Sequence, residues 1–173
     1  MNEPIPLVLG GIRILPDAGP IRQRYERLAG GSAVLRMHGG RGVKMTHFRK
    51  WRTAISGSGW LDPGLEDLDY SGGVELLCIM PRGKDGTGPN FILPPAATIR
   101  PDVAPWGLVR VGANWLETGI TMAGNVAQLG PVPGASRYRL CWLPRMVVFS
   151  EGLVSDYDES TGRYDWSLDA EEV

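Results

Sequence analysis

Short apolar segments, separated every few residues by glycine or proline, run along the whole chain. At the N-terminal end, residues 5–9 and 12–15 predict two short strands on either side of Gly10-Gly11, a dipeptide typical of tight turns. The C-terminal part predicts further strands at residues 106–117, 120–129, 137–143, 146–151, 153–157 and 162–168. About ten short strands at this spacing, joined by Gly- and Pro-rich loops, indicate an all-β fold, either a sandwich or a barrel.

Residues 21–28 fit two periodicities. Three apolar positions lie at helical spacing after Pro20, but Gln23 and Tyr25 also alternate with arginines as in a half-exposed strand, and we favour the strand. Next, residues 32–37 and 43–55 flank a glycine-rich turn and predict a hairpin with a long second strand. Charged side chains on both faces of that strand suit contact with a partner subunit, whereas an exposed edge strand protected by Lys and Arg is the alternative.

The middle of the chain predicts fewer strands. Residues 74–80 are aliphatic enough for a buried strand, but residues 81–89 contain three glycines and two prolines and predict a mobile loop. Prolines in residues 90–105 predict an extended surface segment with little pairing. No change of composition marks a linker, so we expect a single domain over residues 1–173.

The composition is that of a protein that folds in water, with 43% hydrophobic and 21% charged residues in a chain of 173. The 24 glycines and 14 prolines argue against a helical bundle. Apolar runs are far shorter than the roughly 20 residues of a membrane span, and residues 1–6 lack the features of a signal peptide. We therefore expect synthesis in a reducing cytoplasm, where Cys78 and Cys141, both in apolar stretches, are buried thiols.

Charge is distributed unevenly, although the net charge is only −1. Residues 1–52 carry ten Lys or Arg against three acids, a net of +7, and residues 150–173 carry eight acids against one arginine, a net of −7. These ends could pair within one fold, join neighbouring subunits, or place the basic end on nucleic acid. For contact between subunits, the candidate interface residues are Arg22, Arg24 and Arg27 on one side and Asp156, Asp158 and Glu159 on the other.

Residues that could carry chemistry are few and poorly spaced for it. In the predicted hairpin, His38 lies beside the turn and His47 lies several residue pairs away from it, so the two cannot bind one metal ion. The two cysteines lie in different predicted strands and lack the spacing of metal ligands. The acids around Asp156 resemble the start of a calcium loop, but Ser167 stands where such a loop needs a bidentate Glu. The chain also lacks a nucleophile elbow and a phosphate loop. We expect no enzymatic activity, no cofactor and no metal.

Two motifs within residues 32–70 carry a resemblance to a group of known proteins. They are T-x-I-S-G-x-G at residues 53–59 and PGL-x-x-LDY at residues 63–70, and both follow the predicted hairpin. This stretch, under a quarter of the chain, resembles segments of small structural proteins of tailed bacteriophages. The resemblance implies a virion component, a minor tail or tail-tip protein built from β-structure and working as part of a ring. It transfers no functional residue.

Together these features predict a structural virion protein of a tailed bacteriophage, in the tail, tail tip or baseplate, made in the host cytoplasm. Its expected partners are further copies in a homo-oligomeric ring and neighbouring virion proteins, with no membrane and no nucleic acid. The alternative is a monomeric module that binds carbohydrate or nucleic acid through its six tryptophans and the loop at 81–89. An enzyme whose catalytic triad forms only in the fold is a third class.

Overall fold

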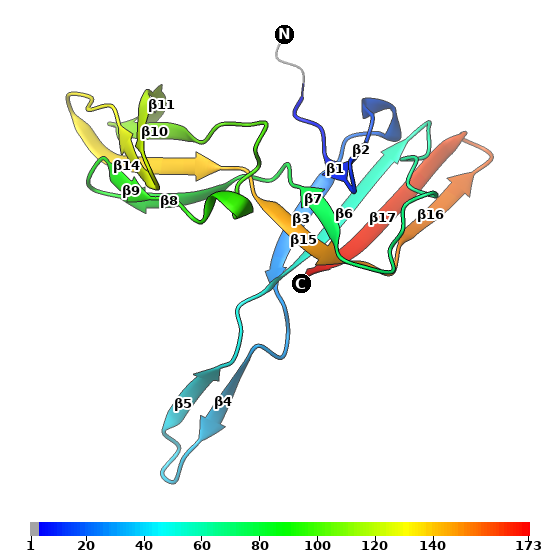
Figure 1. The fold of residues 1–173 in the computed structure, drawn as a ribbon, viewed down its shortest axis with the longest axis horizontal. Coiled ribbons are helices and arrows are strands. Elements are labelled where there is room, and N and C mark those ends of the chain that lie inside the picture. The colour runs from blue at the N-terminus through cyan, green and yellow to red at the C-terminus, as the bar shows by residue number, and fades with distance from the viewer. Residues whose placement is uncertain (1–3) are drawn as a thin grey trace. The chain divides into compact units, whose positions relative to one another are not determined.

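The computed structural model describes residues 4–173, whose regular secondary structure consists almost only of strands (Figure 1). Seventeen strands and two short 3-10 helices occur in these residues, and the strands belong to four sheets. The prediction of an all-β fold is confirmed. Contacts within the chain divide it into two compact units: unit 1 runs to Leu76 and resumes at Val147, and unit 2 is Leu77–Met146. The limits of unit 2 fall inside strands β7 and β15, so no linker composition marks them in the sequence.

Unit 1 is organised around a sheet of eight strands in the order β2-β1-β7-β15-β17-β6-β3, with β16 paired to β17. A 3-10 helix, η1 (Pro16–Ala18), follows β2. The strands of this sheet are β1 (Val8–Leu9), β2 (Ile12–Arg13), β3 (Arg22–Arg27), β6 (Trp51–Gly59), β7 (Val74–Leu77), β15 (Arg145–Phe149), β16 (Leu153–Asp158) and β17 (Arg163–Glu172).

Two features of this sheet follow directly from the sequence. The turn between β1 and β2 is Gly10-Gly11, and both residues have positive φ, +56° and +84°, a conformation that glycine adopts without strain. Residues 22–27 form a strand, as the alternation of arginines predicts. The structure therefore confirms the strand interpretation of this ambiguous segment.

The central strands β6 and β17 bury one face and expose the other. Ile55 and Leu168 are paired across the two strands and are almost fully buried, as the two-residue period requires. Trp166 lies opposite Gly57, where a Cβ atom would come within 2.6 Å of the indole ring. The indole Nε1 donates a hydrogen bond of 2.9 Å to the carbonyl of Ala18, so η1 is joined to this core face.

The hairpin predicted after residue 32 is present, but its second strand is much shorter than expected. β4 (Ser32–Arg36) and β5 (Gly42–Thr46) form a two-stranded sheet, and the chain then leaves the ladder until β6 begins at Trp51. The prediction of one long strand over residues 43–55 is wrong. The carbonyl of Gly31 accepts hydrogen bonds from two successive amides, His47 at 2.8 Å and Phe48 at 3.3 Å, which interrupts regular pairing.

Unit 2 consists of two sheets that share a core. The core is formed by Phe91, Leu93, Val109, Ala127, Leu129, Tyr138, Leu140 and Trp142. One sheet has the order β11-β10-β14-β8 and contains β8 (Arg82–Gly86), β10 (Trp106–Val111), β11 (Asn114–Thr118) and β14 (Ala135–Trp142). The other has the order β12-β13-β9 and contains β9 (Asn90–Ile92), β12 (Ile120–Ala123) and β13 (Val126–Leu129).

The segment predicted as a mobile loop contributes to this unit. Residues 82–86 form β8 and pair with β14, with Gly83 opposite Cys141. Its glycines misled the prediction, because an edge strand tolerates residues that a central strand does not. After β9 comes a 3-10 helix, η2 (Ala96–Thr98), and then Arg100, whose side chain is fully buried. Residues 90–105 therefore differ from the expected extended surface segment in having a paired strand, a 3-10 helix and a buried arginine.

Candidate assembly surfaces

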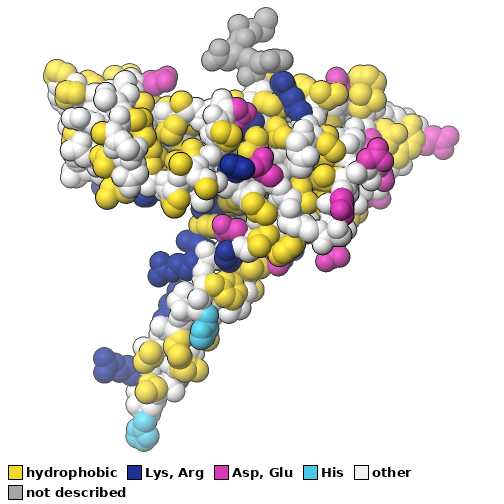
Figure 2. All heavy atoms as spheres, viewed as in Figure 1, with side chains coloured by type: hydrophobic (Ala, Val, Ile, Leu, Met, Phe, Trp, Pro, Cys, Tyr) yellow, Lys and Arg dark blue, Asp and Glu magenta, His cyan; other side chains and the backbone are white. Residues whose placement is uncertain are grey.

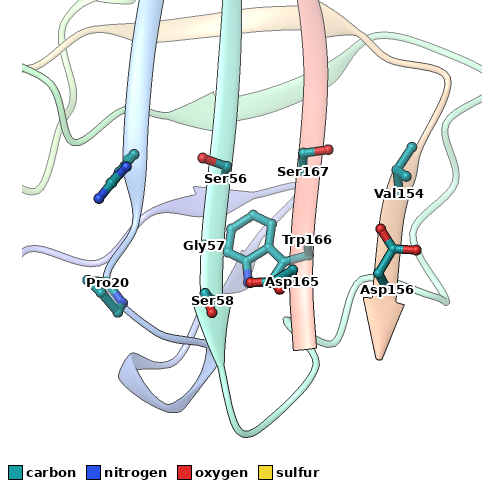
Figure 3. Close-up of a pocket in the computed structure, with 10 residues that line it drawn as sticks. Pro20, Ser56, Gly57, Ser58, Val154, Asp156, Asp165, Trp166 and Ser167 are labelled. Carbon is teal, nitrogen blue, oxygen red and sulfur yellow. The ribbon is translucent and has the colours of Figure 1, made fainter. Parts of the chain in front are cut away.

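The outer face of the unit 1 sheet, opposite the buried one, carries polar side chains from β6, β16 and β17. Ser56 and Ser167 are paired across β6 and β17, and Ser58 is paired with Asp165 two residues further along. With Arg22 and Asp156 they line an open pocket of about 400 Å³ (Figure 3). This face is the first candidate surface.

The residues predicted to meet between subunits lie at opposite edges of this part of the sheet. β3 is the last strand of the order and pairs with β6, while β16 pairs with β17 on the other side. The local order is therefore β3-β6-β17-β16. The basic candidates belong to the first edge and the acidic candidates to the second.

Two of the three basic candidates have partners within the chain. Arg24 donates a hydrogen bond of 3.1 Å to Glu26, and its side chain is 76% exposed. The guanidinium of Arg27 stacks on Trp51, with its central carbon 3.7 Å from the ring centroid. Arg22 is exposed on the edge strand and reaches the pocket. It is the basic candidate best placed to meet another molecule.

The acidic candidates also differ from one another. Asp158 closes the turn between β16 and β17, where its carboxylate accepts hydrogen bonds from the hydroxyls of Ser160 at 2.6 Å and Thr161 at 2.9 Å. The bond from Ser160 and then that from Thr161 lower the pKa of Asp158. Glu159 is exposed in the same turn. Asp158 therefore serves the local fold, and Asp156 is the better candidate for an external contact.

Asp156 lies directly opposite another carboxylate. Its partner across the ladder of β16 and β17 is Asp165, and both line the pocket. Like charges in such a pair destabilise a sheet by a few tenths of a kcal/mol to about 1 kcal/mol. A cationic group from a partner would relieve this repulsion. The pair thus marks where a basic side chain would bind favourably.

A second groove, also of about 400 Å³, lies on the same face near the end of β15. Its apolar part is formed by Phe149 and Val154, which are 51% and 65% exposed. Three acids surround this apolar part, namely Glu151, Asp169 and Glu171. Arg52 also lines the groove and forms an ion pair of 3.2 Å with Asp169. The groove is therefore both apolar and acidic.

The hairpin β4–β5 is a third candidate surface. All ten of its strand residues are exposed, and they pair only with each other among the described strands. Figure 2 shows basic and hydrophobic side chains along the hairpin, and acidic side chains over the region of β16 and β17. No acidic residue occurs between Arg27 and Leu61, and six Lys or Arg lie in that stretch. The hairpin is thus basic and apolar.

Of the residues considered for metal or thiol chemistry, both histidines are exposed and both cysteines are buried. Cys78 and Cys141 are buried without a disulfide, and burial raises the pKa of the Cys141 thiol. Within residues 4–173, no group of three or more His, Cys, Asp or Glu side chains could hold a metal ion. None of the helices in that range is long and apolar enough to cross a membrane.

Comparison of the chain with protein-family models, with curated proteins and with solved structures gave no match. The surfaces must therefore be interpreted from their own chemistry.

Sequence reasoning missed the apolar and acidic groove. Its residues come from four strands, β6, β15, β16 and β17, and from the turn after β15, and the register of β17 with its three neighbours brings them together. The nearest signal in the sequence is the set of C-terminal acids. The sequence identified these acids as a group without indicating that Phe149 lies among them.

Proposed function

We propose that this chain is a structural subunit without enzymatic activity that assembles with further copies of itself. The observation that carries the proposal is the separation of charge between the two edges of the unit 1 sheet. β3 presents Arg22 at one edge, and β16 presents Asp156 at the other. Surfaces that are complementary but different lead to head-to-tail contacts, and such contacts form a ring when the rotation between subunits closes.

Strand edges suit this role for a further reason. An edge strand has unpaired backbone groups and can pair with a strand of another molecule. Charged side chains at an edge prevent indiscriminate pairing, but opposite charges on two different edges permit one pairing and disfavour others. Contact of β3 with β16 of a neighbour would combine backbone hydrogen bonds with ion pairs.

The setting we propose is the virion of a tailed bacteriophage, as a minor tail, tail-tip or baseplate component. This part of the proposal comes from the resemblance of residues 32–70 and is supported by the all-β fold. Neighbouring virion proteins would then be further partners. The proposal does not require a cofactor.

The decisive experiment is the mass in solution, measured by light scattering after size exclusion at low salt and at 1 M salt. We expect a discrete oligomer that loosens at high salt, because the screening length there falls to about 3 Å. Asp156→Arg should reduce the mass at low salt. The variant should not destabilise the fold, because Asp165 would then face an opposite charge in place of a like charge.

A charge swap makes the test specific. The double variant Arg22→Asp with Asp156→Arg carries complementary edges again and should recover the oligomer. Glu117→Arg, in the exposed strand β11, makes the same change of charge elsewhere and should leave the mass unchanged. A strict monomer in both salts, or an oligomer indifferent to all three variants, would overturn the proposal and favour a monomeric binding module.

A further inference from the structure

The two faces of the hairpin β4–β5 differ in character. Residues directly opposite each other in the ladder share a face, so Ala33 with Met45 and Leu35 with Val43 form one face, which is entirely apolar. The pairs on the other face are Ser32 with Thr46, Val34 with Lys44, and Arg36 with Gly42. The hairpin is therefore amphipathic.

Among residues 4–173, no other strand packs on the apolar face. Leu35, Val43 and Met45 are 51%, 41% and 44% exposed. An isolated two-stranded hairpin is at best marginally stable in water, and contiguous exposed apolar side chains mark interaction sites. This pattern is explained if the face is buried in an assembly.

The apolar and acidic groove of unit 1 has the complementary properties. Phe149 and Val154 offer apolar surface, and three acids against Arg52, which pairs with Asp169, leave the groove with net negative charge from Glu151 and Glu171. The hairpin offers an apolar face with basic residues beyond its ends, Arg41 in the turn and Arg49 in the connection to β6, while Arg36 and Lys44 lie on the opposite face. Residues 28–60 contain no acid. Both the chemical character and the sign of the charge match.

We propose that the hairpin of one copy docks with its apolar face in the groove of a second copy. The inference rests on the proposed function, because it names the partner of the hairpin as another copy of this chain. Nucleic acid fits less well, because phosphates would engage the basic side chains and leave the apolar face in water. The hairpin and the groove are different surfaces, so this contact is also head-to-tail.

A cross-linking experiment with two variants, each carrying one added cysteine, tests the contact. Met45→Cys in the apolar face and Phe149→Cys in the groove are made in separate full-length chains, mixed at low salt and oxidised mildly. Both native cysteines are buried and should not interfere. A disulfide requires Cα atoms within roughly 7 Å, so a mixed dimer forms efficiently only if the two positions meet.

Val34→Cys is the matched control, because it lies in the same hairpin on the opposite face. We expect a mixed dimer from Met45→Cys with Phe149→Cys and at least about ten-fold less from Val34→Cys, since contact distance decides the yield. Equal yields, no mixed dimer, or a predominant dimer of Met45→Cys with itself would overturn the inference. The last result would indicate that two hairpins pack face to face.

A second pair of variants measures the contribution of the face. Met45→Asp should weaken self-association by about ten-fold or more, because the interface would bury a carboxylate without a partner. Val34→Asp changes the charge of the hairpin equally and should have a clearly smaller effect. The experiments distinguish failure of the edge contact from failure of the hairpin contact. If only the edge contact is wrong, the Arg22 and Asp156 variants leave the mass unchanged while the cross-link still forms.

Discussion

At the scale of single residues, Arg100 is the largest of the fully buried side chains among the described residues. Its guanidinium donates to the carbonyl of Cys78 at 3.0 Å and to both carboxylate oxygens of Asp102, at 2.7 and 2.9 Å. It therefore connects the chain after β7 with the segment after η2. A buried cation is tolerated here because every direction it faces supplies an acceptor.

We expect Asp102→Asn to destabilise the protein by about 2 kcal/mol at neutral pH, because it leaves a buried guanidinium without its counter-charge. This value is below that of a fully buried pair, since the Asp102 side chain is 50% exposed. The control is Asp85→Asn, which breaks the surface pair with Arg139 and should cost about 0.5 kcal/mol. Chemical denaturation measures both, and equal losses would contradict the role of burial.

The same pair predicts a dependence on pH. Hydrogen bonds from Arg100 are the main cause that lowers the pKa of Asp102 below its usual value of 3.8. The stabilisation is therefore complete above that value and is lost as the pH falls through the lower pKa of the folded state. The difference in unfolding free energy between the native chain and Asp102→Asn should shrink in strong acid, as denaturation at neutral and acidic pH would show.

At the scale of elements, the hairpin β4–β5 should be the least protected regular structure in the isolated subunit. Its strands are exposed throughout, and their backbone hydrogen bonds open without exposing a core. Hydrogen exchange should be fast at residues 32–46 at low protein concentration, and slower at high concentration if copies associate through the hairpin as proposed. β6 and β17 serve as internal controls, because they should be protected under both conditions. Equal protection of the hairpin at the two concentrations would contradict this expectation.

Elements with a local signature were predictable from the sequence. The Gly10-Gly11 turn and the alternation within residues 22–27 carry their own signals. The structure has the turn and strand β3 at these positions. The break after β5 and the pairing of β8 depend instead on distant partners. Gly31 interrupts the second strand from across the ladder, and β14 orders residues that have a loop-like composition.

The candidate surfaces show the same division. Charge along the chain identified Arg22 and Asp156 as members of opposite groups, but only the strand order places them at opposite edges. Charge alone could not show that Asp158 and Arg27 have partners within the chain. Asp158 accepts hydrogen bonds from two hydroxyls of its turn, and Arg27 stacks on an aromatic ring that folding brings close. That the two edges meet in an assembly is still a prediction.

At the scale of the whole molecule, the division into two units predicts where a core mutation acts. Leu140 is fully buried in the core of unit 2. Leu140→Ala should destabilise that unit by about 2–5 kcal/mol, the usual range for removing a buried leucine side chain. Hydrogen exchange should increase in β10 and β14 while β6 and β17 change much less. A uniform increase over both units would show that they unfold as one.

Unit 2 leaves the unit 1 sheet from β7 and returns to it through β15, and these two strands are neighbours in the sheet order. For the sheet of unit 1, the whole segment is therefore equivalent to one loop whose two ends are adjacent. The entropy of closing a loop grows only with the logarithm of its length, so growth or shrinkage of this segment disturbs that sheet little. The segment between β7 and β15, residues 78–144, is therefore the place where we expect an insert of another length or sequence to leave the strand register of unit 1 unchanged.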